Sequence, residues 1–343
     1  MLGEILSTLK TIVLGLGALG LVLLALYALT VKLPGRWRER SQVFIFLLPG
    51  LFAIFIGLFV PSILTILRSF KNDKLKNAKF IGLDNFKEIF TDKDARRVVT
   101  NSLTWVIVGT LAVVVLAIIV ARFADGMKGE RVAKSLMFIP TCISLAGAGI
   151  IWRFVYAGPP IKVGLLNSIT KGIGLPSDMG GNGDQLWLTE RALGHFTPPY
   201  SAPGFNTFLL IIVFIWANAG IATVILSAAI KGVPESLIEA AKMDGATNRQ
   251  AFYKVTLPYI RSTIITVATL TVIAGFKAYD VVAAMTGGNA GTSTIANEWY
   301  VKFFLQEREG YASSLAVVMF VLVVPFVVLN RRAQRRAEEL MGA

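Results

Sequence analysis

Few residues in this chain could do chemistry, because most of the sequence is apolar. Of its 343 residues, 55% are hydrophobic and 16% are charged, with one histidine, His195, and one cysteine, Cys142. A single cysteine provides neither an intramolecular disulfide nor a cysteine-based metal site, and His195 lies in a polar loop typical of a solvated residue. The sequence has no HExxH motif, no Walker A motif and no nucleophile–base pair at informative spacing. We therefore expect no enzymatic activity, catalytic residue, metal or cofactor in this chain.

The most informative polar stretch is residues 234–258. It lies between two apolar runs, 205–230 and 264–282, each long enough to cross a bilayer. Pro234 is typical of a first helical position, and Gly245 is typical of a helix stop in the left-handed conformation. A second short helix is expected after this stop. The pattern predicts a helix–turn–helix that lies at the membrane surface, which we call the coupling loop.

The coupling loop would present small residues with polar groups beside them. Small side chains give the turn a low profile, so that the backbone of another protein could approach closely. The residues expected to make this contact are Glu239, Ala240, Ala241, Asp244 and Gly245. The alternative is an ordinary amphipathic surface helix, and the pattern alone does not decide between the two.

A resemblance favours the contact. Glu239-Ala-Ala, Asp244-Gly-Ala, Phe252 and Leu257-Pro258 resemble, in type, spacing and place between two spans, the EAA loop of permease subunits of ATP-binding-cassette importers. The resemblance implies that residues 235–257 dock on a cytoplasmic ATPase, which binds ATP and magnesium and drives alternating access. It also implies a second permease subunit, an ATPase dimer and an extracytoplasmic solute-binding protein as partners.

A second resemblance concerns the substrate. Residues 276–280 (Phe-Lys-Ala-Tyr-Asp), followed by 286–289 (Thr-Gly-Gly-Asn), are similar to a segment of carbohydrate permeases of the maltose, α-glucoside and glycerol-phosphate group. The similarity extends over about residues 43–330 and implies a sugar, such as an α-glucoside or another di- or oligosaccharide. The sugar-contacting asparagines of the maltose permease are replaced here by Gly, Ala or Phe-Lys. Those contacts do not carry over, and the particular sugar stays open.

Polar and aromatic residues within apolar spans are the candidates for the substrate path. The bilayer makes such polar groups costly unless they face the interior of a helix bundle, and aromatic faces with amide and hydroxyl groups suit a sugar. The candidates are Asn218, Trp216, Phe276, Tyr279, Asp280, Thr141 and Ser144. The alternative is structural, since Ser, Thr and Asn also join helices, and Lys277 with Asp280 could form a local ion pair.

Apolar spans must position all these residues. Hydropathy predicts an all-α polytopic membrane protein with about seven transmembrane helices, one extra N-terminal helix and a six-helix importer core. A cleavable signal peptide is the alternative for the first span, but its apolar part is too long. The predicted domains are residues 1–42, a helix and basic linker; 43–330, the core; and 331–343, a basic tail. The predicted spans are 12–31, 43–67, 103–123, 132–156 (interrupted by Pro140), 205–230, 264–282 and 314–329.

The net charge of +13 indicates anchoring to anionic lipid, not nucleic-acid binding, because the basic residues flank the spans. If the coupling loop is cytoplasmic, loops 32–40 and 124–134 and the tail are cytoplasmic too. Loops 68–100, 157–204 and 286–311 then face outward. We expect a multi-pass protein of the cytoplasmic membrane of a bacterium or archaeon.

Two other functions remain open. An ion-coupled secondary transporter would need buried carboxylates along several spans and inverted repeats, but only Asp280 is a candidate and no repeat is found. A membrane scaffold without transport is the third possibility.

Overall fold

A computed structural model describes residues 2–31, 35–73, 78–158, 164–173, 187–188 and 202–341. These residues are mostly helical and include no strand, only an isolated antiparallel bridge between Lys71 and Phe80. The predicted all-α fold class is confirmed. His195 and most of loop 157–204 lie outside the described residues.

The chain divides into two compact units, Met1–Leu67 and Arg68–Ala343. In the first, α1 (Leu2–Val31) packs on α2 (Gly35–Ile54), which continues through a π-helical turn into α3 (Val60–Ser69). The apolar window within Leu47–Ser69 has no buried residue. Such a helix needs lipid or another protein around it.

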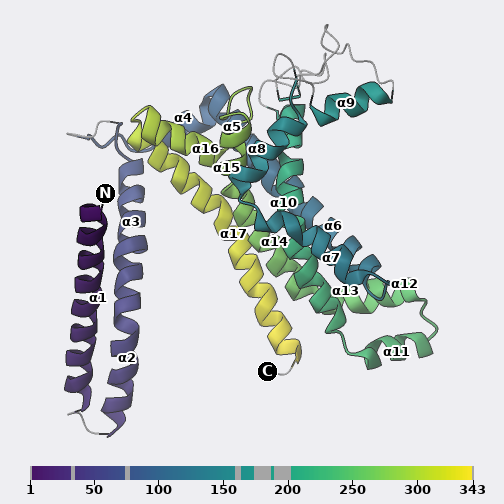
Figure 1. The fold of residues 1–343 in the computed structure, drawn as a ribbon, viewed down its shortest axis with the longest axis horizontal. Coiled ribbons are helices and arrows are strands. Elements are labelled where there is room, and N and C mark those ends of the chain that lie inside the picture. The colour runs from purple at the N-terminus through teal and green to yellow at the C-terminus, as the bar shows by residue number, and fades with distance from the viewer. Residues whose placement is uncertain are drawn as a thin grey trace. The chain divides into compact units, whose positions relative to one another are not determined.

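The second unit holds the remaining helices (Figure 1). Short π-helical turns follow α5, α12 and α16, and a 3-10 turn follows α7. In chain order the helices are α4 (Asp84–Thr91), α5 (Lys93–Thr104), α6 (Thr110–Ala124), α7 (Glu130–Phe138), α8 (Leu145–Val155), α9 (Leu165–Gly172), α10 (Phe205–Lys231), α11 (Glu235–Met243), α12 (Asn248–Ala251), α13 (Leu257–Tyr259), α14 (Arg261–Phe276), α15 (Asp280–Met285), α16 (Ile295–Tyr300) and α17 (Glu309–Met341).

Four described helices are long and apolar enough to cross a membrane. They are Leu47–Ser69, Lys93–Ala124, Phe205–Lys231 and Glu309–Arg336. Two bent helix pairs raise this number to 6 if each pair counts as one span. The N-terminal helix α1 contains a shorter apolar stretch, Val13–Ala25. The helices therefore agree with the predicted polytopic membrane protein.

Two predicted spans need comment. The span over 132–156 is interrupted at Pro140, as predicted, and its halves meet at 102°. Pro140 lacks a backbone N–H, Ile143 is extended, and Ser144 caps the next helix. The predicted span 264–282 ends early, at Phe276, because a tight turn follows in which the Tyr279 N–H donates to the Lys277 carbonyl at 2.7 Å.

Helix α10 is the centre of the second unit. It packs against α6, α7, α8 and α14, and 61% of its apolar window is buried. Its Phe214 ring lies edge-on to Trp105, with ring centroids 5.5 Å apart, and both side chains are fully buried. The core is therefore built around the helix that leads into the coupling loop.

The connections of the second unit gather at two opposite ends (Figure 1). The coupling-loop end holds α11, α12 and α13, the α6–α7 connection and the C-terminal end of α17. The α16 end holds α4, the start of α5, α9 and α16. This is the grouping that the orientation argument predicts for the segments of this unit.

Candidate coupling loop and transport path

Two local motifs shape the coupling loop. Gly245 has a φ of 84°, and its N–H donates to the Lys242 carbonyl at 2.9 Å, while the Ala246 N–H donates to the Ala241 carbonyl at 2.9 Å. These bonds form a Schellman motif, which needs a residue in the left-handed conformation. The stop at Gly245 is therefore where the sequence predicts it. Pro234 caps α11 and does not occupy its first turn, a shift of one residue.

The second half of the coupling loop is anchored. Thr247 and Gln250 form a capping box, with the Thr247 N–H donating to Gln250 Oε1 at 2.8 Å. The Arg122 guanidinium, at the end of α6, lies 5.4 Å from the centre of the Phe252 ring. This cation–π contact ties the loop to a membrane-spanning helix.

The first half of the coupling loop, α11, has no buried residue. The Met243 side chain is 88% exposed, and Leu237 is also exposed. Glu239, Ala240, Asp244 and Gly245 are exposed and Ala241 is half-buried. An exposed helix with apolar side chains and a low-profile turn is typical of a surface that another protein covers.

A cluster of charges, which we call the α7–α10 ion cluster, lies beside the coupling loop. It consists of Asp125, Glu130, Lys134, Ser227 and Lys231. The Lys134 ammonium donates to Asp125 Oδ1 at 2.7 Å, to Glu130 Oε1 at 2.6 Å and to Ser227 Oγ. Lys231 also pairs with Glu130. The sequence analysis did not predict this cluster, because Lys134 and Ser227 are 93 positions apart.

Four of the predicted path residues lie around the break between α7 and α8. Thr141 Oγ1 donates to the Ala217 carbonyl at 3.3 Å, and Ser144 Oγ accepts the Gly147 N–H at 3.1 Å. The Trp216 ring lies 5.7 Å from that of Trp152. Asn218 Nδ2 donates to the carbonyl of Phe214 on its own helix at 2.8 Å. The break thus brings Thr141 next to the stretch of α10 that carries Trp216 and Asn218.

The other three lie near the α14–α15 turn. Phe276 is 1% exposed and packs with Val106 and Val272 in the core, so its ring faces no open path in this conformation. The Tyr279 ring lies 4.9 Å from that of Tyr300, and Asp280 is exposed at the start of α15. No described hydrogen bond or ring contact joins these residues to the four at the break.

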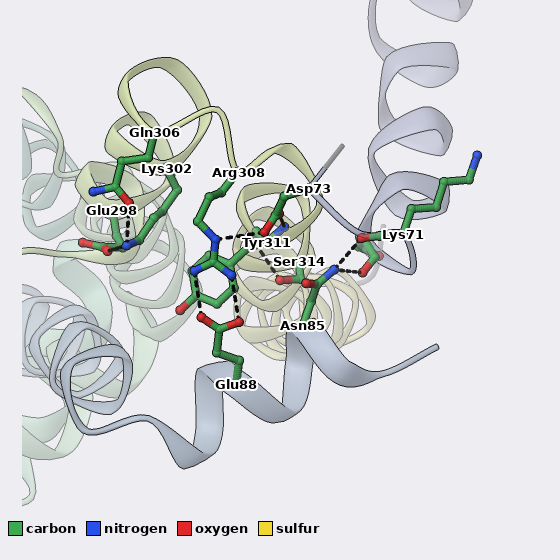
Figure 2. Close-up of polar contacts among 11 residues, drawn as sticks. Lys71, Asp73, Asn85, Glu88, Glu298, Lys302, Gln306, Arg308, Tyr311 and Ser314 are labelled. Atoms are coloured by element: carbon green, nitrogen blue, oxygen red, sulfur yellow. Dashed lines mark hydrogen bonds and ion pairs between the residues drawn. The ribbon is translucent and has the colours of Figure 1, made fainter. Parts of the chain in front are cut away.

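The α16 end is tied together by charge (Figure 2). Arg308 donates to both carboxylate oxygens of Glu88, at 2.7 and 2.8 Å, and to Asp73 Oδ2 at 2.9 Å. Asp73 Oδ1 also accepts the N–H of Tyr311 at 2.9 Å. The bonds to Glu88 raise the pKa of the Arg308 guanidinium above its usual value. This bidentate pair fixes α4 against the start of α17.

The same end contains a polar cavity of about 300 Å³ between α5, the turn over 286–294 and α16. Asn101, on α5, donates to the carbonyls of Gly291 at 2.8 Å and Ser293 at 2.9 Å and so holds the turn in place. The Thr-Gly-Gly-Asn segment singled out in the sequence thus forms part of the wall of this cavity. The polar residues that line the cavity are Asp94, Arg97, Asn101, Asn289, Ser293 and Glu298.

Among the residues that the structure describes, no three histidine, cysteine, aspartate or glutamate side chains are grouped so that they could hold a metal ion.

Partial burial and the neighbouring Tyr300 raise the pKa of the Tyr279 hydroxyl. A tyrosine hydroxyl is protonated near neutral pH even without this shift, so it can donate a hydrogen bond.

Membrane-spanning helices with an exposed helix–turn–helix at one end form the arrangement expected of a membrane subunit that binds a partner there. The family model described as "Binding-protein-dependent transport system inner membrane component" matches residues 113–339. The chain belongs to this family. It is thus a multi-pass inner-membrane subunit of a binding-protein-dependent transport system, as the resemblance of the coupling loop implied.

Two curated relatives match most of this chain and most of their own length. The chain is 38% identical over 295 residues to the osmoprotective compounds uptake permease protein GgtC of Synechocystis sp., covering 85% of this chain and 98% of the relative. It is 33% identical to the alpha-glucoside transport system permease protein AglF of Rhizobium meliloti, covering 88% and 84%.

A solved structure supports the fold. A chain of a bacterial ABC transporter involved in the import of the acidic polysaccharide alginate matches with a TM-score of 0.69, covering 87% of this chain and 96% of that one. The sequence identity is 21%, so this likeness concerns the fold alone.

Proposed function

We propose that this chain is the transmembrane subunit of an ATP-driven sugar importer, with a di- or oligosaccharide such as an α-glucoside as cargo. The name of the relative AglF, an alpha-glucoside permease, supports this class. The name of GgtC refers to osmoprotective compounds, so small polyhydroxyl solutes belong to the panel that must be tested.

The exposed α11 is the observation that carries the proposal. Its small turn, with Glu239, Ala240, Ala241, Asp244 and Gly245, has the shape expected of a surface that enters a cleft on a partner. We assign that partner as a cytoplasmic ATPase dimer, which binds ATP and magnesium. A second permease subunit and an extracytoplasmic solute-binding protein complete the assembly. The chain itself has no enzymatic role.

The geometry suggests how force would reach the membrane helices. Helix α10 ends at Lys231, and only three residues separate it from α11. A displacement of α11 by the ATPase would therefore move α10, the central helix of the core. Alternation between two arrangements of these helices is a shift between two states that ATP binding favours differently.

The substrate path in this proposal passes the break between α7 and α8. Hydroxyl, indole and amide groups are supplied there by Thr141, Ser144, Trp216 and Asn218. The Asn218 side-chain N–H donates to the Phe214 carbonyl, while the Asn218 side-chain oxygen has no described partner. Tyr279 and Asp280 are the candidates near the α14–α15 turn. Phe276 would join them only if the helices repack.

The experiment is uptake by the complete complex in proteoliposomes. Labelled maltose, sucrose, trehalose and glycerol are offered with the solute-binding protein outside and ATP in the lumen. We expect uptake of at least one of these solutes with ATP and none without it. A complex with a catalytically inactive ATPase is the matched control. Uptake driven by a proton or sodium gradient without ATP would overturn the proposal and favour a secondary transporter.

A further inference from the structure

Helix α7 and the 3-10 turn after it, Ile139–Cys142, follow α10 closely. At one end, Lys134 donates to Ser227 Oγ. Further along, a Cβ atom on Gly220 would lie only 2.1 Å from the Met137 carbonyl oxygen, so the two backbones touch there. The backbones can approach this closely because Gly220 has no side chain.

The far end of this contact lies at the break. Thr141 Oγ1 donates to the Ala217 carbonyl at 3.3 Å, and Pro140 beside it is buried. Ile143 then leaves the helical conformation, and the next helix starts at a different angle. Helix α7 is therefore attached to α10 along its length, whereas α8 runs at 102° to α7 and contacts α10 through Trp152 and Trp216.

The near end of the contact is fixed by the α7–α10 ion cluster. The ammonium group of Lys134 has three hydrogens and three acceptors, on Asp125, Glu130 and Ser227. The Lys134 side chain is 16% exposed and Ser227 is buried. Partial burial of this kind reduces screening by water and salt, so the ion pairs hold more firmly than exposed ones.

The cluster is also next to the coupling loop. Lys231, the last residue of α10, pairs with Glu130, the first residue of α7. Val233 is buried, and α11 starts two residues later. A movement of α11 thus reaches the ends of α7 and α10 together.

We infer that Lys134 is a positioning residue that makes α7 move with α10, so that a displacement of the coupling loop is transmitted to the break at residues 140–144. This inference rests on the proposed function, because it needs a partner ATPase to displace α11. The α7–α8 break, with Thr141 and Ser144, then opens or closes in step with the ATPase.

The chain carries its own reporter for this movement, since Cys142 is exposed and lies at the break. In the complete complex, the rate at which a water-soluble maleimide modifies Cys142 is measured by mass spectrometry of this chain. One sample contains ATP with the magnesium chelated, and the other contains no nucleotide. In the wild type we expect ATP to change this rate by about tenfold, within the range of measured coupling energies between sites.

Lys134→Met removes the ammonium and should reduce the ATP-dependent change to less than about twofold, since mutations along a coupling route alter coupling on this scale. Lys134→Arg keeps the charge and should restore most of the change. Lys128→Met is the matched control: it removes a positive charge from the α6–α7 connection just before α7, where Lys128 is exposed and has no described ion pair. This variant should behave as the wild type.

If Lys134→Met does not assemble, Ser227→Ala tests the same link more gently, because it removes one hydroxyl and leaves the ion pairs intact. It should lower the ATP-dependent change partially. The inference is overturned if Lys134→Met or Ser227→Ala keeps the full change, or if ATP leaves Cys142 reactivity unaltered in a wild-type complex that transports. A complex without ATP-driven uptake would instead overturn the proposed function, and the two failures are thereby distinguished.

Discussion

The α16 end of the second unit and helix α11 at the opposite end differ in how their polar residues are used. At the α16 end, Arg308 binds both Glu88 and Asp73, and the buried Asn101 holds the turn over 286–294. At the coupling-loop end, α11 has no buried residue. Polar groups that bind one another within the chain stabilise its fold. A helix such as α11, which has no buried residue, instead presents its side chains to a partner outside the chain. We therefore expect changes at the α16 end to alter stability, and changes at the coupling loop to alter transport.

The largest effect is expected for Gly245→Pro. Proline fixes φ near −65°, which is incompatible with the φ of 84° at this position, and it removes the N–H that donates to Lys242. Uptake should fall by at least about tenfold, the cost of losing one well-made docking contact. Membrane insertion, measured by protease protection, should be unchanged. Unchanged uptake would contradict the expectation that changes at the coupling loop alter transport.

Asn101→Leu tests the α16 end. Asn101 is fully buried, and the substitution leaves the carbonyls of Gly291 and Ser293 without this donor. We expect the free energy of unfolding to fall by about 3 kcal/mol, measured as a lower melting temperature in detergent. Asn289→Ala, at an exposed position of the same turn, is the control and should change it much less. Equal shifts would show that the turn does not depend on Asn101.

Arg308→Leu should have a smaller effect on stability. The substitution leaves Asp73 and Glu88 facing each other without a cation, but Arg308 is 30% exposed, and water screens part of the repulsion. We expect a loss of about 1–2 kcal/mol. The exposed Arg96, which has no described ion pair, provides the control Arg96→Leu. A loss of uptake per folded molecule in Arg308→Leu would mean that this end also takes part in transport.

The smallest effect is expected for Asn218→Leu. The side chain is half-buried, and its amide N–H stays within its own helix, so assembly and melting temperature should change little. If its carbonyl oxygen meets the solute, the relative uptake of maltose, sucrose, trehalose and glycerol should change by a few-fold, the scale of one hydrogen bond. An unaltered ranking of these solutes would exclude Asn218 from the path.

The sequence predicts well the features that depend on local chemistry. Apolar runs locate the membrane helices, because length and hydropathy are local properties. The Gly245 stop follows from the need for a left-handed residue at the end of α11. The functional class is implied by the resemblance of this loop to the EAA loop of importer permeases, since the pattern of residues alone does not decide it.

Features that depend on packing between distant segments could not be predicted in this way. The direction of α8 after Pro140 depends on its packing against α15, where Gly149 lies against Ala284. Phe276 was a path candidate, but its contacts with Val106 and Val272 place it in the core. Arg308 and Glu88 form an ion pair although they are 220 positions apart in the sequence. No local pattern indicates such pairs.

The central claim is that α11 faces the cytoplasm and is covered there by a partner ATPase. In a Cys142→Ser background, which removes the single native cysteine of this chain, Ala240→Cys places a thiol on the exposed face of α11. A membrane-impermeant maleimide should leave this thiol unmodified in intact cells, modify it in inverted vesicles stripped of the ATPase, and modify it slowly once the ATPase is restored. Modification in intact cells, or an unchanged rate with the ATPase bound, would contradict the account.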